Sequence, residues 1–249
     1  MLTNKLNNNI VLWAAMILAM PGLRAQPATI FRDGSGYLAA GLESDAFLST
    51  SLAYYHLVPG SRDNRASMLH AGIQVPVLLA FKGEGNHAFR LDAGYQWGGI
   101  YRERYCVDGR LDLFFMNHSA VLGTFRPVGA ELNGAAGFRF RRSFLGIFCK
   151  WHHVLATHVT HSDYSKESYK EIIPGGISGF VPMDGWFSNT ASMIGYGVRY
   201  SSPVRGRMAL NVDIGAVNHL SEFTGMLDAM MIGQLPFMLE MKLFYRLQK

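Results

Sequence analysis

The sequence contains little charge. Lys, Arg, Asp and Glu make up 16% of its 249 residues, whereas about a quarter is usual in globular proteins. The chain is 49% hydrophobic and contains 27 glycines, so it is too apolar to be disordered. Its two cysteines, Cys106 and Cys149, are too few for a disulfide scaffold or a four-cysteine metal site, and whether they pair depends on the fold. A chain of this composition needs an apolar environment.

Long hydrophobic runs are also missing. Beyond residue 25 no apolar run reaches the 18 residues that a transmembrane helix requires. The longest candidate, residues 73–81, is interrupted by Gln74 and Pro76. Phosphate-binding glycine loops, Cys-x-x-Cys and Gly-x-Ser-x-Gly elements are absent from the sequence. If the chain enters a membrane, it does so without helices.

The first 25 residues have the features of an export signal. Lys5 supplies positive charge, and residues 10–20 form an apolar core that is too short to span a membrane. Cleavage after Ala25 would leave residues 26–249 as the mature domain. Removing residues 1–25 takes away two basic residues and no acidic one, which leaves 21 basic and 18 acidic residues. These are scattered along the chain, so we expect no nucleic-acid partner.

Apolar and polar residues alternate along most of the mature chain. The segments 89–97, 131–141, 210–216 and 239–247 show the alternation best. Successive side chains of a β-strand point to opposite faces, so this period of two predicts strands with one apolar and one polar face. Weaker strands are predicted at 36–43, 48–58, 68–82, 111–124, 144–157 and 188–202. They are roughly 8 to 16 residues long, which exceeds the usual five or six of a soluble sheet.

The polar face distinguishes a soluble sandwich from a membrane barrel, because a barrel encloses its polar face and turns its apolar face to lipid. Cations and anions on the predicted polar face nearly balance, as a narrow lumen requires, since an unpaired charge out of water costs several kcal/mol. We therefore predict an all-β fold, an antiparallel transmembrane β-barrel of about ten strands, with eight to twelve compatible. The predicted lumen charge network comprises Arg90, Asp92, Glu131, Arg139, Arg141, Asp213, Glu240, Lys242 and Arg246.

The export signal, the alternating strands and the amphipathic terminal strand together resemble small Gram-negative outer-membrane β-barrel proteins. This resemblance implies the bacterial outer membrane as location, with outer-membrane lipid and lipopolysaccharide as partners. Such barrels have long external loops and short periplasmic turns. We therefore expect the polar intervals 158–189 and 220–235 to be external and the turn at 202–204 to be periplasmic. An apparent long interval at 98–112 and a break at Arg126-Pro127 do not fit this order.

His219 and Ser221 form a short motif at the end of a predicted strand. The motif resembles the His-x-Ser element of outer-membrane lipid-hydrolysing barrels, the lipid A deacylases and phospholipase, in which the His is general base for a Ser nucleophile. The resemblance implies a serine esterase that acts on membrane lipid. The alternation nevertheless places both residues on the inward face, and only a bulge between Ala216 and His219 would turn them outward.

Five residues in the middle of the chain are of types that can bind a metal. His152 and His153 are neighbours on a predicted strand and therefore point to opposite faces. His158, His161 and Asp163 follow with a spacing that could surround a metal ion. Histidines in loops are more often simply solvated, and we predict neither a metal site nor another cofactor.

Three functions remain open from the sequence. The first is a non-enzymatic barrel with a filled, charge-paired lumen and an external loop, 158–189, that binds a protein partner. The second is a lipid hydrolase that uses His219 and Ser221. The third is a narrow channel for small anionic solutes, which the arginines of the predicted lumen would attract: Arg90, Arg139, Arg141 and Arg246. The width of the lumen tests the channel, and the face of the barrel wall on which His219 lies tests the hydrolase.

Overall fold

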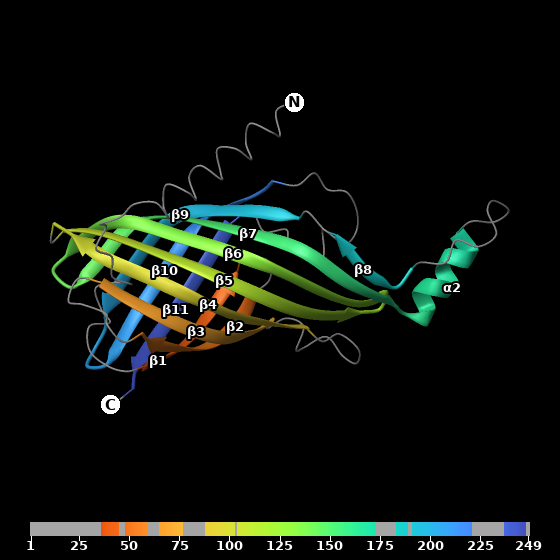
Figure 1. Cartoon of the computed structure of the whole chain (residues 1–249), viewed down its shortest axis with the longest axis horizontal. Coiled ribbons are helices and arrows are strands. Elements are labelled where there is room, and N and C mark those ends of the chain that lie inside the picture. Colours follow the sequence, from red (N-terminus) through yellow and green to blue (C-terminus); the bar gives the residue numbers. More distant parts are fainter. Residues whose placement is uncertain are drawn as a thin grey trace, which may run out of the picture.

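The computed structural model describes residues 36–44, 48–58, 65–76, 88–102, 104–172, 183–188, 191–220 and 237–247. Ten antiparallel strands close into a barrel, and the short strand β8 adds to one side of it (Figure 1). The predicted fold class and strand number are therefore confirmed. Residues 1–25, the predicted export signal, lie outside this description. In the described ranges, no helix has the length and apolarity needed to cross a membrane.

The strands follow one another around the barrel in chain order. Their bounds are β1 Gly36–Ser44, β2 Leu48–Leu57, β3 Arg65–Pro76, β4 Ala88–Tyr101, β5 Tyr105–Ala120, β6 Gly123–Phe140, β7 Ser143–His161, β9 Ser192–Pro203, β10 Met208–His219 and β11 Phe237–Arg246. The connection from β7 to β9 contains the helix α2, Asp163–Ile172, and the strand β8, Gly185–Ser188. β7 pairs with β9, and β11 pairs with β1 to close the ring.

Two of the predicted irregular intervals are strands. β6 runs through Arg126-Pro127 without a break, and most of 98–112 belongs to β4 and β5, which are joined by the short turn 102–104. The predicted strand 111–124 is correspondingly wrong at its outer end, because it crosses the turn 121–122. These corrections restore a regular alternation of strand directions. Pro76 is the last residue of β3, a rim position that suits a residue without a backbone N–H.

β7 contains a β-bulge at Leu155. The residues on either side of Leu155 pair with two adjacent residues of β6, Val128 and Gly129, so Leu155 is extra. Before the bulge the buried side chains of β7 are even-numbered, and after it they are odd-numbered. The extra residue therefore lets both halves of β7 keep their buried side chains on the inner face.

The longest connections all lie at one end of the barrel. One end, which we call the loop end, carries 45–47, 77–87, 121–122, 162–191 and 220–236, and the other, the turn end, carries 58–64, 102–104, 141–142 and 204–207. The first and last described residues also meet at the turn end, where the Leu247 N–H donates to the Gly36 carbonyl at 3.0 Å. The two longest connections therefore share one end, and the turn after Pro203 lies at the opposite end.

Three strands extend beyond the others at the loop end (Figure 1). They are β5, β6 and β7, with 16, 18 and 19 residues. β8 pairs with residues 156–159 of β7, and α2 lies at the tip of this extension. The predicted loop 158–189 is wrong at its start, because β7 continues to His161. Part of the remainder, 173–182 and 189–190, lies outside the described residues.

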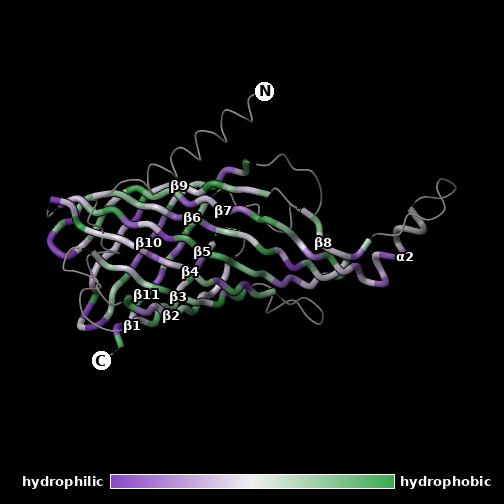
Figure 2. The backbone as a smooth tube through the Cα atoms, in the orientation of Figure 1, coloured by the Kyte–Doolittle hydropathy of each residue, from purple (hydrophilic) through white to green (hydrophobic). Residues whose placement is uncertain are grey.

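The outward faces of the strands are apolar, whereas many inward positions carry polar side chains. Figure 2 shows hydrophobic and hydrophilic residues alternating along the strands. Leu113 and Ile147 are 65% and 69% exposed, while Asp112 and Glu131 are buried. In a water-soluble protein charged residues are almost never fully buried and large apolar residues usually are, so this barrel has the reverse distribution.

Aromatic side chains border the outward aliphatic residues at both ends. Towards the turn end, Tyr54, Tyr95, Tyr101, Tyr105, Phe138, Phe140, Tyr200 and Tyr245 are exposed. Towards the loop end, the outward positions include Phe89, Phe115, Trp151, Tyr196 and Phe237. Along β11 the two borders are Phe237 and Tyr245, about 26 Å apart at roughly 3.3 Å per residue. A strand tilt of about 40° reduces this to roughly 20 Å along the barrel axis.

Candidate functional site in the charged barrel interior

Fourteen Lys, Arg, Asp, Glu and His side chains form ion pairs with one another at inward positions on nine of the ten barrel strands, all except β2. The strand alternation places them there, because each is flanked in sequence by outward-facing residues. Five are Lys or Arg, seven are Asp or Glu, and two are His. They are Arg90, Arg110, Lys150, Arg199 and Lys242; Glu43, Asp92, Asp108, Asp112, Glu131, Asp213 and Glu240; and His70 and His152.

Glu131 is the centre of the largest group. Its side chain is 0% exposed, and its two carboxylate oxygens accept hydrogen bonds from Arg90 Nη2 at 3.0 Å and Arg110 Nη2 at 2.8 Å. Lys150 Nζ lies 3.4 Å from Oε1, and His152 Nδ1 lies 3.4 Å from Oε2. Such contacts offset the several kcal/mol that removing a charge from water costs.

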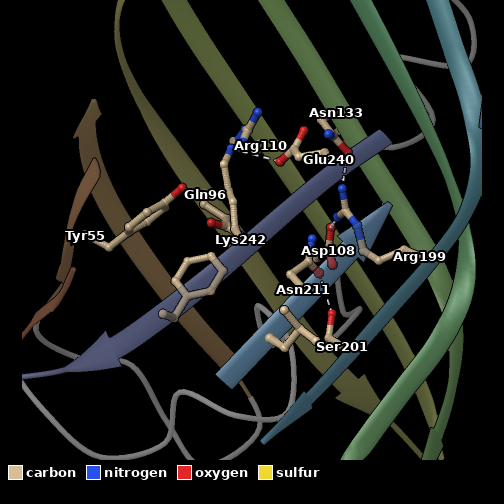
Figure 3. Close-up of a pocket in the computed structure, with 12 residues that line it drawn as sticks. Tyr55, Gln96, Asp108, Arg110, Asn133, Arg199, Ser201, Asn211, Glu240 and Lys242 are labelled. Atoms are coloured by element: carbon tan, nitrogen blue, oxygen red, sulfur yellow. Dashed lines mark hydrogen bonds and ion pairs between the residues drawn. The ribbon is translucent and has the colours of Figure 1, made fainter. Parts of the chain in front are cut away.

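Arg199 connects strands that are not neighbours in the sheet. It binds Asp213 of β10 with two donors, Nε at 2.8 Å and Nη2 at 2.6 Å, and binds Asp108 of β5 through Nη1 at 2.8 Å. Its Nη2 also donates to Asn133 at 3.1 Å (Figure 3). Paired donation to one carboxylate fixes the orientation of a guanidinium group as well as its position. Arg199 therefore ties β5 and β10 together across the interior.

Lys242 forms a third group on the β1 side of the barrel. Its Nζ lies 2.8 Å from both Glu43 Oε1 and Glu240 Oε1. Gln74 Nε2 donates to the second oxygen of Glu43 at 2.6 Å. Glu240 also lies 4.0 Å from Lys150 Nζ, which contacts Glu131 in turn. The Lys242 and Glu131 groups are therefore parts of one connected network.

His70 lies between two carboxylates on the β3–β5 side. Its Nε2 is 3.0 Å from Asp112 Oδ1 and 3.6 Å from Asp92 Oδ2. Arg110 Nε lies 2.7 Å from the other oxygen of Asp112 and joins this pair to Glu131. Gly94 provides the necessary space, since a Cβ there would lie 2.1 Å from Asp112 Oδ1 and 2.3 Å from a backbone carbonyl. A larger residue at position 94 would displace the acidic side chain.

A small cavity lies among the side chains of the network (Figure 3). Its lining includes Asp108, Arg110, Arg199, Glu240 and Lys242. The space open to the centres of water-sized molecules is about 40 Å³, which suffices for a few waters at roughly 10–15 Å³ each. Next to it the side chains of Tyr37, Tyr55, Met68 and Phe244 pack into an apolar cluster. As lined by the described residues, the cavity can hold water molecules but not a larger solute.

Six residues of the predicted network take part in these ion pairs, and three do not. Arg90, Asp92, Glu131, Asp213, Glu240 and Lys242 form interior ion pairs. Arg139, Arg141 and Arg246 lie at the turn end instead. Arg139 and Arg246 are the cross-strand partners of the buried Phe144 and Tyr37, at the ends of β6 and β11, and Arg141 is in the turn after β6. Arg141 is exposed in the β6–β7 turn with a φ of 56°, and Arg139 Nε donates to its carbonyl at 2.8 Å.

These three arginines belong to a larger set at the turn end, which we call the arginine collar. The collar comprises Arg102, Arg104, Arg139, Arg141, Arg142, Arg205, Arg207 and Arg246. All lie in the turns or at the strand ends beside the exposed aromatic side chains of this end. Arg102 lies over the ring of Tyr101, 5.2 Å from its centroid. The collar concentrates positive charge outside the barrel interior.

Sequence reasoning missed eight members of the interior network, one of which, His152, was considered only as a possible metal ligand; the others were not assigned any role. These others are Glu43, His70, Asp108, Arg110, Asp112, Lys150 and Arg199. The signal for three of them is present at 106–114, where Asp108, Arg110 and Asp112 alternate with smaller or apolar residues. Its polar residues and Gly109 make the segment look like a loop when it is taken alone. The structure assigns it to β5, whose inward side chains are even-numbered.

The proposed catalytic pair is only partly covered by the structure. β10 pairs with β9 without a register shift from Ala209 to His219, so the strand has no bulge between Ala216 and His219. Position 219 has the same parity as Asp213 and Val217, whose side chains are buried. The His219 side chain and Ser221 lie outside the described residues. The catalytic roles of these two residues stay predictions.

The histidines of β7 have separate surroundings. His152 is buried, whereas His153 is partly exposed and its Nδ1 contacts Ser192 Oγ, so the two lie on opposite faces as predicted. His161 Nδ1 lies 3.0 Å from the carboxylate of Asp184. In the part of the chain that the structure covers, no three His, Cys, Asp or Glu side chains are placed to hold a metal ion.

The two cysteines do not form a disulfide. Cys106 is buried on the inner side of β5, and Cys149 is exposed on β7. Both thiols are free. The barrel wall therefore separates them.

No family model matches the chain, and no curated protein matches it significantly. The barrel itself is compatible with a small outer-membrane protein, but the lipid A deacylase resemblance has no support beyond the short motif. The function therefore has to be argued from the faces of the barrel.

Proposed function

We propose that the protein is an integral outer-membrane barrel with a closed, charge-paired lumen and a non-enzymatic binding or structural role. The observation that carries this proposal is the division of side chains between the two faces of the wall. Apolar side chains such as Leu113 and Ile147 are exposed on the outside, while Glu131 is buried with its cations inside. An apolar band around a whole barrel is unfavourable in water, and lipid acyl chains would solvate it.

The aromatic borders support this membrane position. Tyr and Trp rings have an apolar body and a polar edge, which suits them to the headgroup level of a bilayer. The borders lie roughly 20 Å apart along the axis, close to the approximately 25 Å of an outer-membrane apolar band. Beyond the turn-end border, the arginine collar is in a position to meet anionic headgroups. In this orientation the turn end faces the periplasm and the loop end faces outward.

The extension at the loop end is the proposed external interaction surface. It consists of the outer parts of β5, β6 and β7 together with β8 and α2. Tyr164 on this extension and Met183, just before β8, are 60% and 73% exposed. Large exposed apolar side chains on a well-formed element are typical of binding surfaces. The surface is suited to a protein partner outside the cell.

Fractionation of cells that express the protein tests its location. We expect it in the outer-membrane fraction, released by detergent and retained after alkaline carbonate washing. Trypsin added to intact cells should cleave in the connection 162–191, which contains Lys166, but not at the arginine collar. Permeabilising the outer membrane should make the collar turns accessible. Recovery in the soluble fraction, or release by carbonate, would overturn the proposal.

Activity measurements test the non-enzymatic part separately. We expect the purified, folded barrel to release no fatty acid from lipopolysaccharide or phospholipid. Release by the wild-type protein that disappears in Ser221→Ala would replace this proposal with the hydrolase. The Ser119→Ala variant, which changes a described loop-end serine away from the motif, is the matched control.

A further inference from the structure

A row of polar and aromatic side chains crosses four adjacent strands on the outward face near the loop end. Arg126 of β6 is the direct cross-strand partner of His158 of β7, which is in turn the partner of Trp186 of β8. On the other side of Arg126, Asn117 of β5 accepts a hydrogen bond from its Nε at 3.2 Å. Cross-strand partners share one face of a sheet. We call these four residues the Arg126 row.

The row lies at the boundary of the apolar band. The next outward position towards the turn end is apolar on three strands: Phe115 pairs with Val128, and Val128 pairs with Ala156. One position further towards the loop end, Ser119 and Thr124 share a hydrogen bond of 3.1 Å. The outward face therefore changes from apolar to polar within these three rows. In the proposed membrane position, the Arg126 row lies at headgroup depth.

Apart from the Arg126 Nε hydrogen bond to Asn117, Arg126 and His158 make no side-chain hydrogen bond to other residues that the structure describes. Arg126 makes one side-chain hydrogen bond, through Nε, and no ion pair, which leaves both terminal NH₂ groups available. His158 Nδ1 is buried and has no hydrogen-bond partner, while its ring packs edge-on against Trp186 at a centroid distance of 5.3 Å. A buried polar atom without a partner carries a free-energy cost unless a ligand or water satisfies it.

Arg126 differs from the other cations of the loop-end half of the barrel because its side chain faces outward. On outward strand positions in the loop-end half of the barrel, within the described ranges, Arg126 is the one Lys or Arg. The other cations of this half, such as Arg90 and Lys150, face inward and pair with Glu131. Two parallel N–H donors of a guanidinium group match two oxygens of a phosphate, and an imidazole N–H can supply a third hydrogen bond. The arrangement suits an anion with several oxygens, such as a phosphate, better than a neutral sugar.

We propose that Arg126 and His158 bind a phosphate group, with Asn117 as a positioning residue that orients the guanidinium group through its Nε. The exposed ring of Trp186 forms one wall of the site. The phosphate is that of a phosphorylated glycolipid of the outer leaflet. This assignment rests on the proposed membrane location, which brings the row to headgroup depth.

Lipid binding by the purified, folded full-length barrel in detergent tests the site. The probe is lipid A carrying both phosphates, and native mass spectrometry measures the fraction of protein with lipid bound across a titration. We expect Arg126→Gln to weaken binding about tenfold or more, as the loss of charge-assisted hydrogen bonds requires. Arg126→Lys keeps the positive charge but lacks the paired N–H donors, so its affinity for lipid A should lie between those of the wild type and Arg126→Gln. Arg205→Gln, in the collar at the opposite end, should bind like the wild type.

Two further arms identify the source of the phosphate. Lipid A from which both phosphates have been removed should bind no better to the wild type than to Arg126→Gln. Inorganic phosphate should compete weakly, because it lacks the acyl chains that contact the apolar band. Competition by inorganic phosphate at equal concentration would replace the glycolipid with the free ion as occupant and would contradict the lipid assignment.

Equal lipid A binding by Arg126→Gln and the wild type would overturn the site. Since binding is measured in detergent, that result is independent of where the protein resides in the cell. A protein that fractionates with the outer membrane but shows no effect of Arg126→Gln would remove this site and leave the proposed function intact. Recovery of the protein in the soluble fraction would instead overturn the proposed function.

Discussion

Glu131 illustrates how single residues make a charged interior compatible with folding. Its carboxylate is fully buried and contacts two guanidinium groups, one ammonium group and one imidazole. Each partner comes from a different position in the wall, and three strands, β4, β5 and β7, meet at this one side chain on β6. Removing its negative charge would leave at least three buried cations with less opposite charge nearby to offset their desolvation. Breaking a buried ion pair from one side costs several kcal/mol, because the remaining charge stays desolvated.

Glu131→Gln should therefore destabilise the barrel by about 3 kcal/mol or more. The amide keeps the volume of the side chain, so the loss reflects charge and not packing. Urea unfolding in detergent micelles, followed by tryptophan fluorescence, measures the change in free energy of unfolding. Glu167→Gln, an exposed acid on α2, is the matched control and should shift stability by less than about 0.5 kcal/mol. Equal midpoints for Glu131→Gln and the wild type would contradict the role of the network.

At the scale of a strand, the bulge at Leu155 determines which side chains of β7 face inward. It lets His152 and Thr157 share the inner face although their numbers differ in parity. A one-residue deletion normally transfers every following side chain to the opposite face. Deleting the extra residue of a bulge differs, because it leaves a regular ladder with both halves still correctly oriented.

Deletion of Leu155 should therefore leave a folded barrel, whereas deletion of Ile147 should not. Ile147 lies in the regular part of β7, where it pairs with Ala136, and its loss would send Phe148 and Lys150 outward. The measurement is folding yield from denaturant into detergent, read as the fraction resistant to protease. Similar yields for the two deletions would show that the bulge does not control the faces of β7.

Asp184 fixes the tip of the extension. Its carboxylate accepts hydrogen bonds from Lys166 Nζ at 2.8 Å and from the His161 backbone N–H at 2.7 Å. Lys166 belongs to α2, and His161 ends β7, so one acidic side chain connects the helix with the strand. The Lys166 hydrogen bond is the main cause that lowers the pKa of Asp184 below its ordinary value, and the hydrogen bonds from His161 add to it.

A lowered pKa means that the contact is fully present above the ordinary range of Asp, near pH 4, and is lost only as the pH falls below that range. Lys166→Gln removes the main cause, so the pKa of Asp184 should rise towards its ordinary value. A ¹³C titration of the carboxyl carbon by NMR measures both values. Glu167→Gln, next to Lys166, should leave the titration unchanged. An Asp184 that titrates in the ordinary range in the wild type would disprove this contact.

How far the sequence predicts this fold can be seen by comparing strands. β11 alternates without interruption from Leu239 to Tyr245, and its prediction matches the observed strand closely. β5 and β6 were divided wrongly because Gly109 and Pro127 are common in turns, and only pairing with neighbouring strands keeps them extended. The bulge at Leu155 leaves no local signal. Arg139 and Arg141 were assigned to the lumen because alternation indicates a face but not the point at which a strand leaves the interior.

At the scale of the whole molecule, the sign of the interior charge bears on transport. Among the ion-paired interior residues that the structure describes, seven acidic side chains face five Lys or Arg, with two His beside the acids, and adding Arg139 and Arg246 on the inner face only balances the two signs. The interior therefore offers no excess of fixed positive charge to a small anion. Three of the four arginines assigned to an anion path, Arg139, Arg141 and Arg246, lie at the turn end, and Arg90 is paired with Glu131. These observations disfavour the channel.

Reconstitution into planar bilayers should accordingly give negligible conductance. A closed lumen with water-sized spaces has no continuous path for hydrated ions, and barrels of eight to ten strands have little interior beyond their side chains. Single-channel recording at neutral pH provides the measurement, and a larger porin in the same bilayer confirms that insertion is detected. Stable openings of uniform size would contradict the closed lumen.

The pairing of β1 with β11 has a consequence for the order of assembly. Residues 37–44 bond to residues 239–246, so the first strand acquires its second neighbour from almost the last part of the chain. The ring cannot close before residues 239–246 have been synthesised. Until then both terminal strands have unpaired backbone edges, which other chains can join. Losing β11 would thus yield an open, self-associating sheet and not a smaller barrel.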